Sequence, residues 1–267
     1  MKRYEAVPQL TLTPRMPAIL RIDGRAFHSF TRGFEYPFDK YLSDCMQATA
    51  LSLVRDIPTA SLAYGQSDEI SILLIDYSSL QTEQWFGGKV QKIVSVAASN
   101  ATISFNRNLS QHLKNLFNHY IPNLDKDEAT DRWNSLNGKE NTAMFDARVF
   151  PIPESDVANY FYWRWKDATR NSVSMAARAH FSHKQLSGKN VARMKDMLRY
   201  DADDPWEDMP EFFKDGWTVR KAMREDFDRF VWNIEPVDQD IRSISQQAIE
   251  LSKEGLRDEQ EEQESED

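Results

Sequence analysis

The stretch that decides the fold is Ala18-Ile19-Leu20-Arg21-Ile22-Asp23-Gly24, an apolar run that ends in an acidic residue and a glycine. A second apolar run, Ser61-Leu62-Ala63-Tyr64, leads into the polar turn Gln66-Ser67-Asp68-Glu69, and a third, Ile70 to Ile75, leads out of it. Short apolar runs bounded by turn residues predict buried strands. The second and third runs therefore predict a hairpin, with acidic residues at its tip and at the end of the first strand.

Asp23 and Asp68 are the most informative pair of acidic residues. If the two strands are neighbours in one sheet, both carboxylates lie at the same edge. Mg²⁺ is bound by one or two carboxylates together with phosphate and water oxygens. Two such ions about 3.5–4 Å apart stabilise the attacking and leaving oxygens of a phosphoryl displacement. The pair predicts a nucleotidyl-transfer palm, although Asp-Gly turns and polar hairpin tips also occur without such a site.

The order of the expected elements indicates an α+β fold. Helical spacing of apolar residues predicts helices over residues 38–54 and 84–109, and residues 145–150 read as a fourth strand. With the first strand and the hairpin they give the order βαββαβ, which is typical of a ferredoxin-like antiparallel sheet with helices on one face. Residues 121–143 are polar and predict an irregular segment. Further along, the sequence predicts helical extensions over residues 155–199 and short strands at residues 216–218 and 230–232.

We divide the chain into three parts: a palm-like catalytic core (residues 1–150), a basic helical region with the late strands (151–235), and a helix with an acidic tail (236–267). Residues 253–267 carry a net charge of −6 out of −9 for the whole chain. A run of like charges with few apolar residues predicts disorder. The overall acidity therefore does not describe the surface that a polyanion would meet.

The composition is that of a globular protein, with 267 residues of which 40% are hydrophobic and 28% charged. No apolar run approaches the roughly 18 residues of a membrane span, and the first residues lack the apolar core of a signal peptide. The single cysteine, Cys45, excludes an internal disulfide framework, and its helical context predicts a buried apolar role. We therefore expect a cytoplasmic protein without a membrane partner.

The segment from Arg164 to Arg199 is strongly basic, with a net charge of +7, and Trp163 and Trp165 flank its first residue. Lys and Arg supply most sequence-independent affinity for nucleic acid, and aromatic rings stack on unpaired bases. The same pattern also suits amphipathic helices whose aromatic residues are core. The candidate tRNA contacts in this segment are Arg164, Lys166, Arg170, Arg178, Lys184 and Lys189.

Other patterns are weaker. Lys89 and Lys92 are three residues apart on an expected helix and share a face, which suits either phosphate contact or plain solvation. His180 and His183 lack a third ligand and predict no metal site. The chain has no phosphate-binding loop of the G-x-x-x-x-G-K-[ST] type and no G-x-S-x-G elbow.

At these motifs the chain resembles the tRNA-histidine guanylyltransferase family, over roughly residues 15–235. The matching segments are Arg21-Ile-Asp-Gly-Arg-Ala-Phe-His-Ser-Phe-Thr31, Tyr64-Gly-Gln-Ser-Asp-Glu69, Phe145-Asp-Ala-Arg148 and Trp163-Arg164. The resemblance implies a polymerase- or cyclase-like palm that adds nucleotides to the 5′ end of tRNA in the 3′-to-5′ direction. It also implies two Mg²⁺ ions, ATP or GTP for activation, other nucleoside triphosphates as substrates, and a homotetramer.

The resemblance also implies roles for individual residues. Asp23, Asp68 and the Gly24 carbonyl would hold the metal ions, and Glu69 would be an adjacent catalytic acid. The expected nucleotide contacts are Gly24, Arg25, Ala26, Phe27, His28, Asp39, Ser67, Lys89, Lys92 and Asn171.

Two segments depart from the eukaryotic pattern of that family. The run Thr169-Arg170-Asn171-Ser172 stands in place of His-Ile-Asn-Asn, and Tyr36 stands in place of a lysine. Both changes resemble the bacterial and archaeal-type branch, which implies template-dependent repair of tRNA 5′ ends rather than strict addition of one guanosine to histidine tRNA. The alternatives are a cyclase-like palm enzyme that uses no RNA and a tRNA-binding protein without catalysis.

Overall fold

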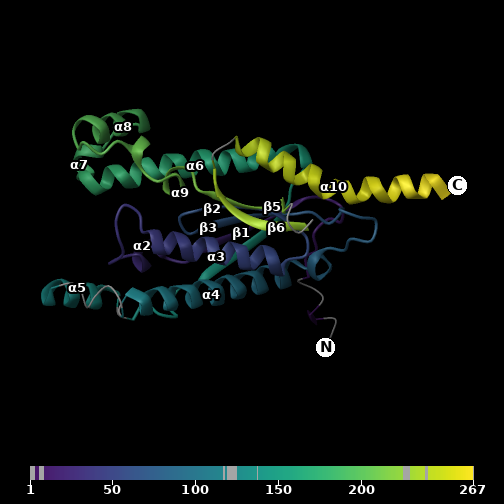
Figure 1. Cartoon of the computed structure of the whole chain (residues 1–267), viewed down its shortest axis with the longest axis horizontal. Helices are drawn as coiled ribbons and strands as arrows, with labels where there is room; N and C mark the ends of the chain where they lie inside the picture. Colours follow the sequence, from purple (N-terminus) through teal and green to yellow (C-terminus); the bar gives the residue numbers. More distant parts are fainter. Residues whose placement is uncertain are drawn as a thin grey trace.

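The computed structural model describes residues 4–5, 9–116, 118, 125–136, 138–224, 229–237 and 240–266. Its centre is a six-stranded sheet of antiparallel pairs in the order β4-β1-β3-β2-β5-β6 (Figure 1). The strands are β1 (Ala18–Gly24), β2 (Ala60–Gln66), β3 (Glu69–Leu74), β4 (Phe145–Pro151), β5 (Trp217–Arg224) and β6 (Arg229–Pro236). The predicted first strand, hairpin and fourth strand are confirmed, and the late strands are longer than expected.

The sheet is apolar on both faces. In β1, Ile19 packs into one core cluster, whereas Leu20 and Ile22 pack into another on the opposite face. Successive residues of a strand point to opposite faces, so a strand that is covered on both sides is a nearly continuous apolar run. This is why β1 lacks the polar alternation of a half-exposed strand.

Helices α3 (Lys40–Asp56) and α4 (Val90–Asn115) cover one face. Their buried residues, among them Met46, Leu53, Ala97 and Phe105, pack on Leu20 and Ile22 of the sheet. These are the two helices of the predicted βαββαβ core, and they lie on one face as expected. The second helix begins at Val90 rather than at residue 84, because η1 (Trp85–Gly88) precedes it.

Helices α6 (Glu154–His180) and α10 (Ile241–Glu266) cover the other face, above the sheet in Figure 1. Val157 and Phe161 of α6 and Ile244 of α10 are buried against Leu62 and Leu73 of the sheet. The predicted helical extensions thus form a second covering layer. Helix α10 continues through the acidic segment to Glu266, where the sequence predicts disorder; Glu and Gln are good helix formers.

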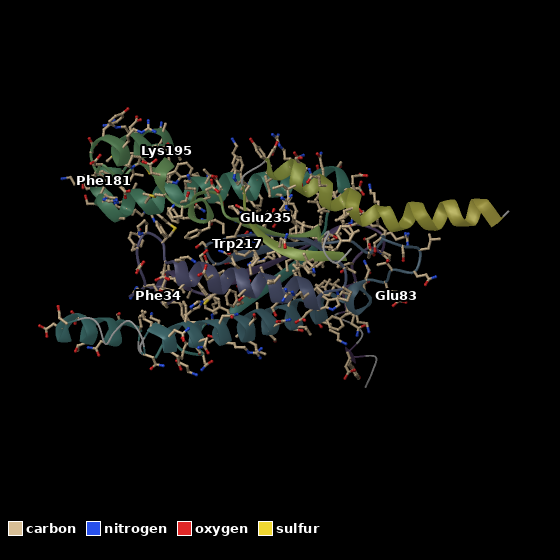
Figure 2. The ribbon with its side chains drawn as sticks, viewed as in Figure 1. Phe34, Glu83, Phe181, Lys195, Trp217 and Glu235 are labelled. Atoms are coloured by element: carbon tan, nitrogen blue, oxygen red, sulfur yellow. The ribbon has the colours of Figure 1, made fainter. Side chains whose placement is uncertain are left out.

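Short helices extend this frame at one end of the molecule. These are α2 (Phe27–Phe30), α5 (Lys126–Leu136), α7 (His183–Leu186), α8 (Val191–Tyr200), η4 (Trp206–Asp208) and α9 (Glu211–Lys214). Helix α5 lies inside the segment that the sequence predicts to be irregular, so that expectation is wrong. Phe181 and Lys195 lie in the α7–α8 group (Figure 2), where the Lys195 amine is 3.4 Å from the centre of the Trp206 ring. In the part of the chain that the structure describes, no helix has the length and apolar character of a membrane span.

Candidate active site

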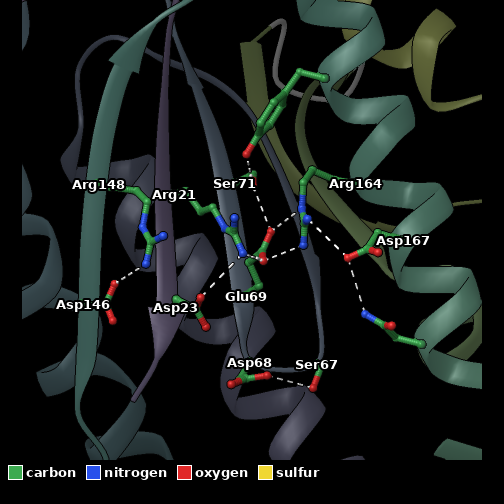
Figure 3. A network of polar contacts seen from close by, with 12 residues as sticks. Arg21, Asp23, Ser67, Asp68, Glu69, Ser71, Asp146, Arg148, Arg164 and Asp167 are labelled. Carbon is green, nitrogen blue, oxygen red and sulfur yellow. Dashed lines mark hydrogen bonds and ion pairs between the residues drawn. The ribbon is translucent and has the colours of Figure 1, made fainter. Parts of the chain in front are cut away.

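The end of β1 is fastened to the tip of the β2–β3 hairpin. Asp23 is the cross-strand partner of Glu69, and the Gly24 amide donates a 3.0 Å hydrogen bond to the Asp68 carbonyl. Ser67, at the tip, has φ 55°, in the left-handed region that a tight turn requires. The acidic residues singled out in the sequence therefore meet at one edge of the sheet, as predicted (Figure 3).

Three carboxylates stand in a row across this edge. Asp146 on β4, Asp23 on β1 and Glu69 on β3 are direct cross-strand partners and share a face. Two arginines of these strands lie among them: Arg21 pairs with Glu69 and lies 3.6 Å from Asp23, and Arg148 pairs with Asp146. Glu69 is held by Arg21 and Arg164, so its negative charge is compensated within the protein.

Arg164 reaches Glu69 from α6. Its Nε and Nη2 donate hydrogen bonds of 2.7 and 2.6 Å to the two carboxylate oxygens, and the side chains are only 11% and 16% exposed. Such a two-point guanidinium–carboxylate contact fixes both partners in orientation. The contact ties α6 to the tip of the hairpin.

Among the described residues, Asp23, Glu69 and Asp146 each have an arginine within 4 Å, whereas Asp68 has none. Burial raises the pKa of its carboxyl above the ordinary value, the charges of Asp23 and Glu69 raise it further, and a 3.0 Å hydrogen bond from Ser67 opposes them. A cation shared by Asp68 and Asp23 would relieve this repulsion. Among the described residues no three His, Cys, Asp or Glu side chains form a complete metal site, so a cation here would need phosphate or water oxygens as well, as Mg²⁺ prefers.

A cavity of about 540 Å³ opens beside Asp68, on the α3 side of the sheet; we call it the nucleotide cavity. Its volume lies in the range of small-molecule sites. Its apolar wall comes from Phe38, Met46, Phe212 and Phe213. Its polar rim comes from the hairpin tip and from the turn after β1, so one side suits a flat ring and the other suits charged groups.

The turn after β1 comes unusually close to its neighbours. A Cβ on Gly24 would lie 2.3 Å from the Phe27 ring, so only glycine fits there. Ala26 has φ 54° and starts the single turn of α2. A left-handed residue followed by helical ones points successive N–H groups into one concavity, which is a common anion-binding arrangement.

A second cavity, of about 460 Å³, lies between the row of acids and α6; we call it the α6 cavity. Asp23 and Glu69 line it from the sheet, and Arg164 and Asn171 line it from the helix. The two cavities share the residues Gln66, Ser67, Asp68, Met175 and Arg178. Asp68 therefore stands where the two spaces meet.

Most of the predicted nucleotide contacts are brought together here. Gly24, Ala26, Phe27, His28, Asp39, Ser67 and Asp68 line the nucleotide cavity, and Asn171 lines the α6 cavity. Arg25 belongs to the same turn, and its amide pairs with the Met144 carbonyl. The Asp39 carboxylate accepts hydrogen bonds from the Glu35 and Leu42 amides, so it also caps α3.

Lys89 and Lys92 are not part of this site. Phe105 is the α4 residue that contacts Phe27, and Lys92 precedes it on the helix by about 20 Å at 1.5 Å per residue. Lys89 precedes the first residue of α4, and the Lys92 amine lies 4.5 Å from the centre of the Phe86 ring. Their spacing predicts a shared helix, whereas only Lys92 lies in α4 and Lys89 is its N-cap, and the spacing does not indicate from which end of the sheet that helix starts.

The basic helical region is only partly free to meet RNA. Arg164 is committed to Glu69, and Arg170 pairs with Asp167. The Lys166 amine lies 5.3 Å from the centre of the Tyr162 ring, whereas Lys184 and Lys189 are exposed. Arg164 is thus corrected from an RNA contact to a structural partner of the site.

Several site residues were missed or misplaced by sequence reasoning. Arg178, expected to contact RNA, lines both cavities. Phe38, Phe212 and Phe213 line the nucleotide cavity although they were not expected there, and so does Tyr36, which the sequence marked only as a departure from the family pattern. The adjacent Phe212-Phe213 pair in an otherwise acidic segment was the available signal.

A palm-like sheet with clustered acids beside two adjoining cavities is the arrangement expected of an enzyme that transfers nucleotidyl groups. The sequence profile described as "tRNAHis guanylyltransferase" matches residues 1–153. The chain belongs to the tRNA(His) guanylyltransferase family and is a nucleotidyltransferase.

Individual relatives agree with this assignment. The tRNA(His) guanylyltransferase of Debaryomyces hansenii is 30% identical over 178 residues, which are 64% of this chain and 58% of the relative. A bacterial tRNA(His) guanylyltransferase-like protein in complex with ATP superimposes with a TM-score of 0.78 at 37% identity, covering 95% of this chain and 97% of that one. A bacterial protein of the same description in complex with GTP gives 0.69 at 34% identity, covering 93% and 96%.

Proposed function

We propose that this chain is a Mg²⁺-dependent nucleotidyltransferase that adds nucleotides to the 5′ end of tRNA in the 3′-to-5′ direction, and that it repairs shortened 5′ ends by templated addition. The observation that carries the proposal is the position of Asp68 between a nucleotide-sized cavity and a second cavity lined by Asp23. Two reactants in these cavities would meet at the two carboxylates.

The nucleotide cavity suits ATP or GTP, the nucleotides found with the two bacterial relatives. The base would pack on Phe38, Phe212 and Phe213. The triphosphate would lie against the amides of residues 26–28, because the first turn of a helix leaves N–H groups without partners inside the helix. This orientation places the phosphates at the hairpin tip. The Arg25 amide, which the resemblance also assigns to this cradle, is already bonded to the Met144 carbonyl.

The acids fit the metal ions that such a reaction needs. Asp23, Asp68 and the Gly24 carbonyl would hold two Mg²⁺ ions, which when bound stabilise the charge that develops on the phosphoryl oxygens. The raised pKa of Asp68 supports this assignment, since burial above all, and the charges of Asp23 and Glu69 in addition, disfavour its carboxylate, and a bound cation would offset both. Glu69, held by Arg21 and Arg164, keeps the hairpin and α6 in place around them.

The run 169–172 supports templated repair over recognition of one tRNA. The Thr169 hydroxyl donates a 2.8 Å hydrogen bond to Asp215, and the Ser172 hydroxyl donates to the Lys214 carbonyl and accepts from the Trp206 indole. Both side chains are used to fasten α6 to the α9 segment. Of the run, Asn171 alone lines the α6 cavity. We therefore expect base pairing within the RNA to supply most of the specificity for the tRNA substrate.

A 5′-extension assay tests the proposal. Full-length histidine tRNA and 5′-truncated tRNAs, each with varied nucleotides in the opposing 3′ strand, are incubated with ATP, the four nucleoside triphosphates and Mg²⁺. We expect truncated tRNAs to be extended with nucleotides complementary to the opposing strand. Addition of guanosine alone, regardless of that strand, contradicts templated repair, and a cyclic nucleotide formed from labelled GTP without RNA contradicts an RNA substrate.

We also propose that the enzyme acts as a homotetramer in the cytoplasm, as the family resemblance implies. Light scattering of the purified chain tests the tetramer: the expected mass is four times 31.1 kDa. A monomeric mass at assay concentration contradicts it.

A further inference from the structure

Arg178 lies on the stripe of α6 that faces both cavities. Asn171, Ser174, Met175 and Arg178 follow each other at intervals of three, one and three residues, which keeps them near one face of a helix. Arg178 is also part of the lining of the nucleotide cavity, together with residues of the turn after β1. It therefore stands at the boundary that Asp68 marks from the sheet side.

The charges around the nucleotide cavity are unbalanced. Three acids, Glu35, Asp39 and Asp68, line it, and Arg178 is its single Lys or Arg. The other two arginines of the α6 cavity, Arg21 and Arg164, both pair with Glu69. Within the described ranges Arg178 forms no ion pair, so its charge is available to a ligand.

Tyr36 is a neighbour of Arg178. Burial raises the pKa of the Tyr36 hydroxyl, and the nearby Arg178 guanidinium opposes that rise. Both residues line the nucleotide cavity. By the resemblance, Tyr36 occupies the position where the eukaryotic pattern has a lysine, and in this chain the Lys or Arg that lines the cavity is Arg178 of α6.

We propose that Arg178 binds phosphate oxygens of a nucleoside triphosphate where the nucleotide cavity meets the α6 cavity, supplying from α6 the charge that position 36 lacks. The inference deepens the proposed function and rests on it. A guanidinium can donate two parallel hydrogen bonds to a phosphate, which a point charge cannot. The contact would hold the phosphate chain beside Asp68.

Equilibrium binding of ATP, inorganic triphosphate and adenosine tests this contact. We expect Arg178→Gln to weaken binding of ATP and of inorganic triphosphate by about 10- to 100-fold, the range for a charge-assisted hydrogen bond, and to leave adenosine binding unchanged. Arg178→Lys keeps the positive charge but not the two parallel donors of the guanidinium, so it should lose less affinity for ATP and inorganic triphosphate than Arg178→Gln does. Arg107→Gln, at an exposed position of α4, is the matched control and should bind all three ligands as the wild type does.

A charge-relocation variant sharpens the test. Tyr36→Lys placed in the Arg178→Gln background should recover at least part of the lost triphosphate affinity. Equal weakening of adenosine and ATP in Arg178→Gln overturns the inference, because it indicates a general disturbance of the cavity. Unchanged ATP binding in Arg178→Gln overturns the inference alone, whereas a wild-type chain that binds no ATP overturns the proposed function with it.

Discussion

Gly24 donates a 3.0 Å backbone hydrogen bond to the carbonyl oxygen of Asp68. The bond continues the β1–β3 pairing one residue beyond Asp23 and Glu69, into the turn itself. The backbone therefore holds the acidic residues at one edge of the sheet even though their charges repel. A site preorganised in this way needs little rearrangement when a cation arrives.

Removing the negative charge of either proposed metal ligand, Asp23 or Asp68, should abolish most of the nucleotide addition. We expect Asp23→Asn and Asp68→Asn each to lower the initial rate of nucleotide addition by about 100- to 1,000-fold, as loss of transition-state charge stabilisation does. Asp146→Asn is the matched control: Asp146 is a cross-strand partner of Asp23, but its side chain is 56% exposed and pairs with Arg148. A variant of Asp23 or Asp68 that adds nucleotides at the wild-type rate would contradict the assignment of that residue as a metal ligand.

A methyl group on Gly24 should disturb the turn that lines the nucleotide cavity. The added Cβ would lie 2.3 Å from the Phe27 ring, and overpacking of this kind costs about 1–3 kcal/mol. We expect Gly24→Ala to lower the free energy of unfolding in urea by that amount and to impair nucleotide addition. Gly188→Ala is the control: it also costs stability because of its positive φ, but its Cβ meets no atom within 4 Å, so activity should persist.

The link between Arg164 and Glu69 should contribute to stability. Arg164→Met leaves a largely buried carboxylate with one partner fewer, and we expect a loss of about 1–3 kcal/mol in the free energy of unfolding. Adding Glu69→Gln to that variant should cost less than Glu69→Gln costs alone, since the interaction has already been removed. Strict additivity in this double-mutant cycle would show that the two side chains are not coupled.

Cys45 should be inert in the folded chain. Burial raises the pKa of its thiol to about 12, and the charges of Asp44 and Asp39 raise it further. Only the thiolate reacts with iodoacetamide, so at pH 8.5 native Cys45 should be alkylated at least about 100-fold more slowly than in urea. Because the unfolded thiol ionises first, stability should fall as pH rises from the ordinary thiol pKa towards 12, and Cys45→Ala should remove that component. Equal native and unfolded labelling rates would contradict the burial.

Lys184 and Lys189 should contribute to RNA affinity through phosphates. We expect the double variant Lys184→Ala/Lys189→Ala to bind all tRNAs more weakly and to show a salt dependence shallower by about one to two in logarithmic slope. ATP binding should not change, since neither residue lines the nucleotide cavity. An unaltered salt slope would exclude these two lysines from the RNA interface.

The parts of the fold that the sequence predicted are those with strong local patterns. The strand β1, the β2–β3 hairpin and the helix α3 each carry their own apolar spacing and turn residues, so their existence was evident. The pairing of β5 with β2 was not, because it depends on contacts more than 150 residues apart in the chain. Helix α5 was missed because its polar composition gives no apolar stripe.

The residues of the candidate site also divide into those that local sequence patterns could place and those that they could not. Asp23 and Asp68 could be placed together because each ends a recognisable strand. Lys89 and Lys92 could not be placed, since helical spacing fixes a shared face but not the direction of the helix along the sheet. Arg178 was assigned to RNA because a basic run looks uniform in sequence, and only packing distinguishes a cation over a cavity from one in solvent.

Helix α6 connects the packing of the core with the lining of the two cavities. Val157 and Phe161 are buried against the sheet face that α6 covers, and Val173 and Ala177 are buried in the cluster around Trp206. Arg178 lies about 26 Å along the axis from Phe161, so a tilt of about 5° at the anchored end would shift its guanidinium by about 2 Å, enough to break a phosphate contact. A substitution that repacks Phe161 should therefore alter the position of Arg178, and with it the rate of nucleotide addition, without changing any residue that lines the cavities.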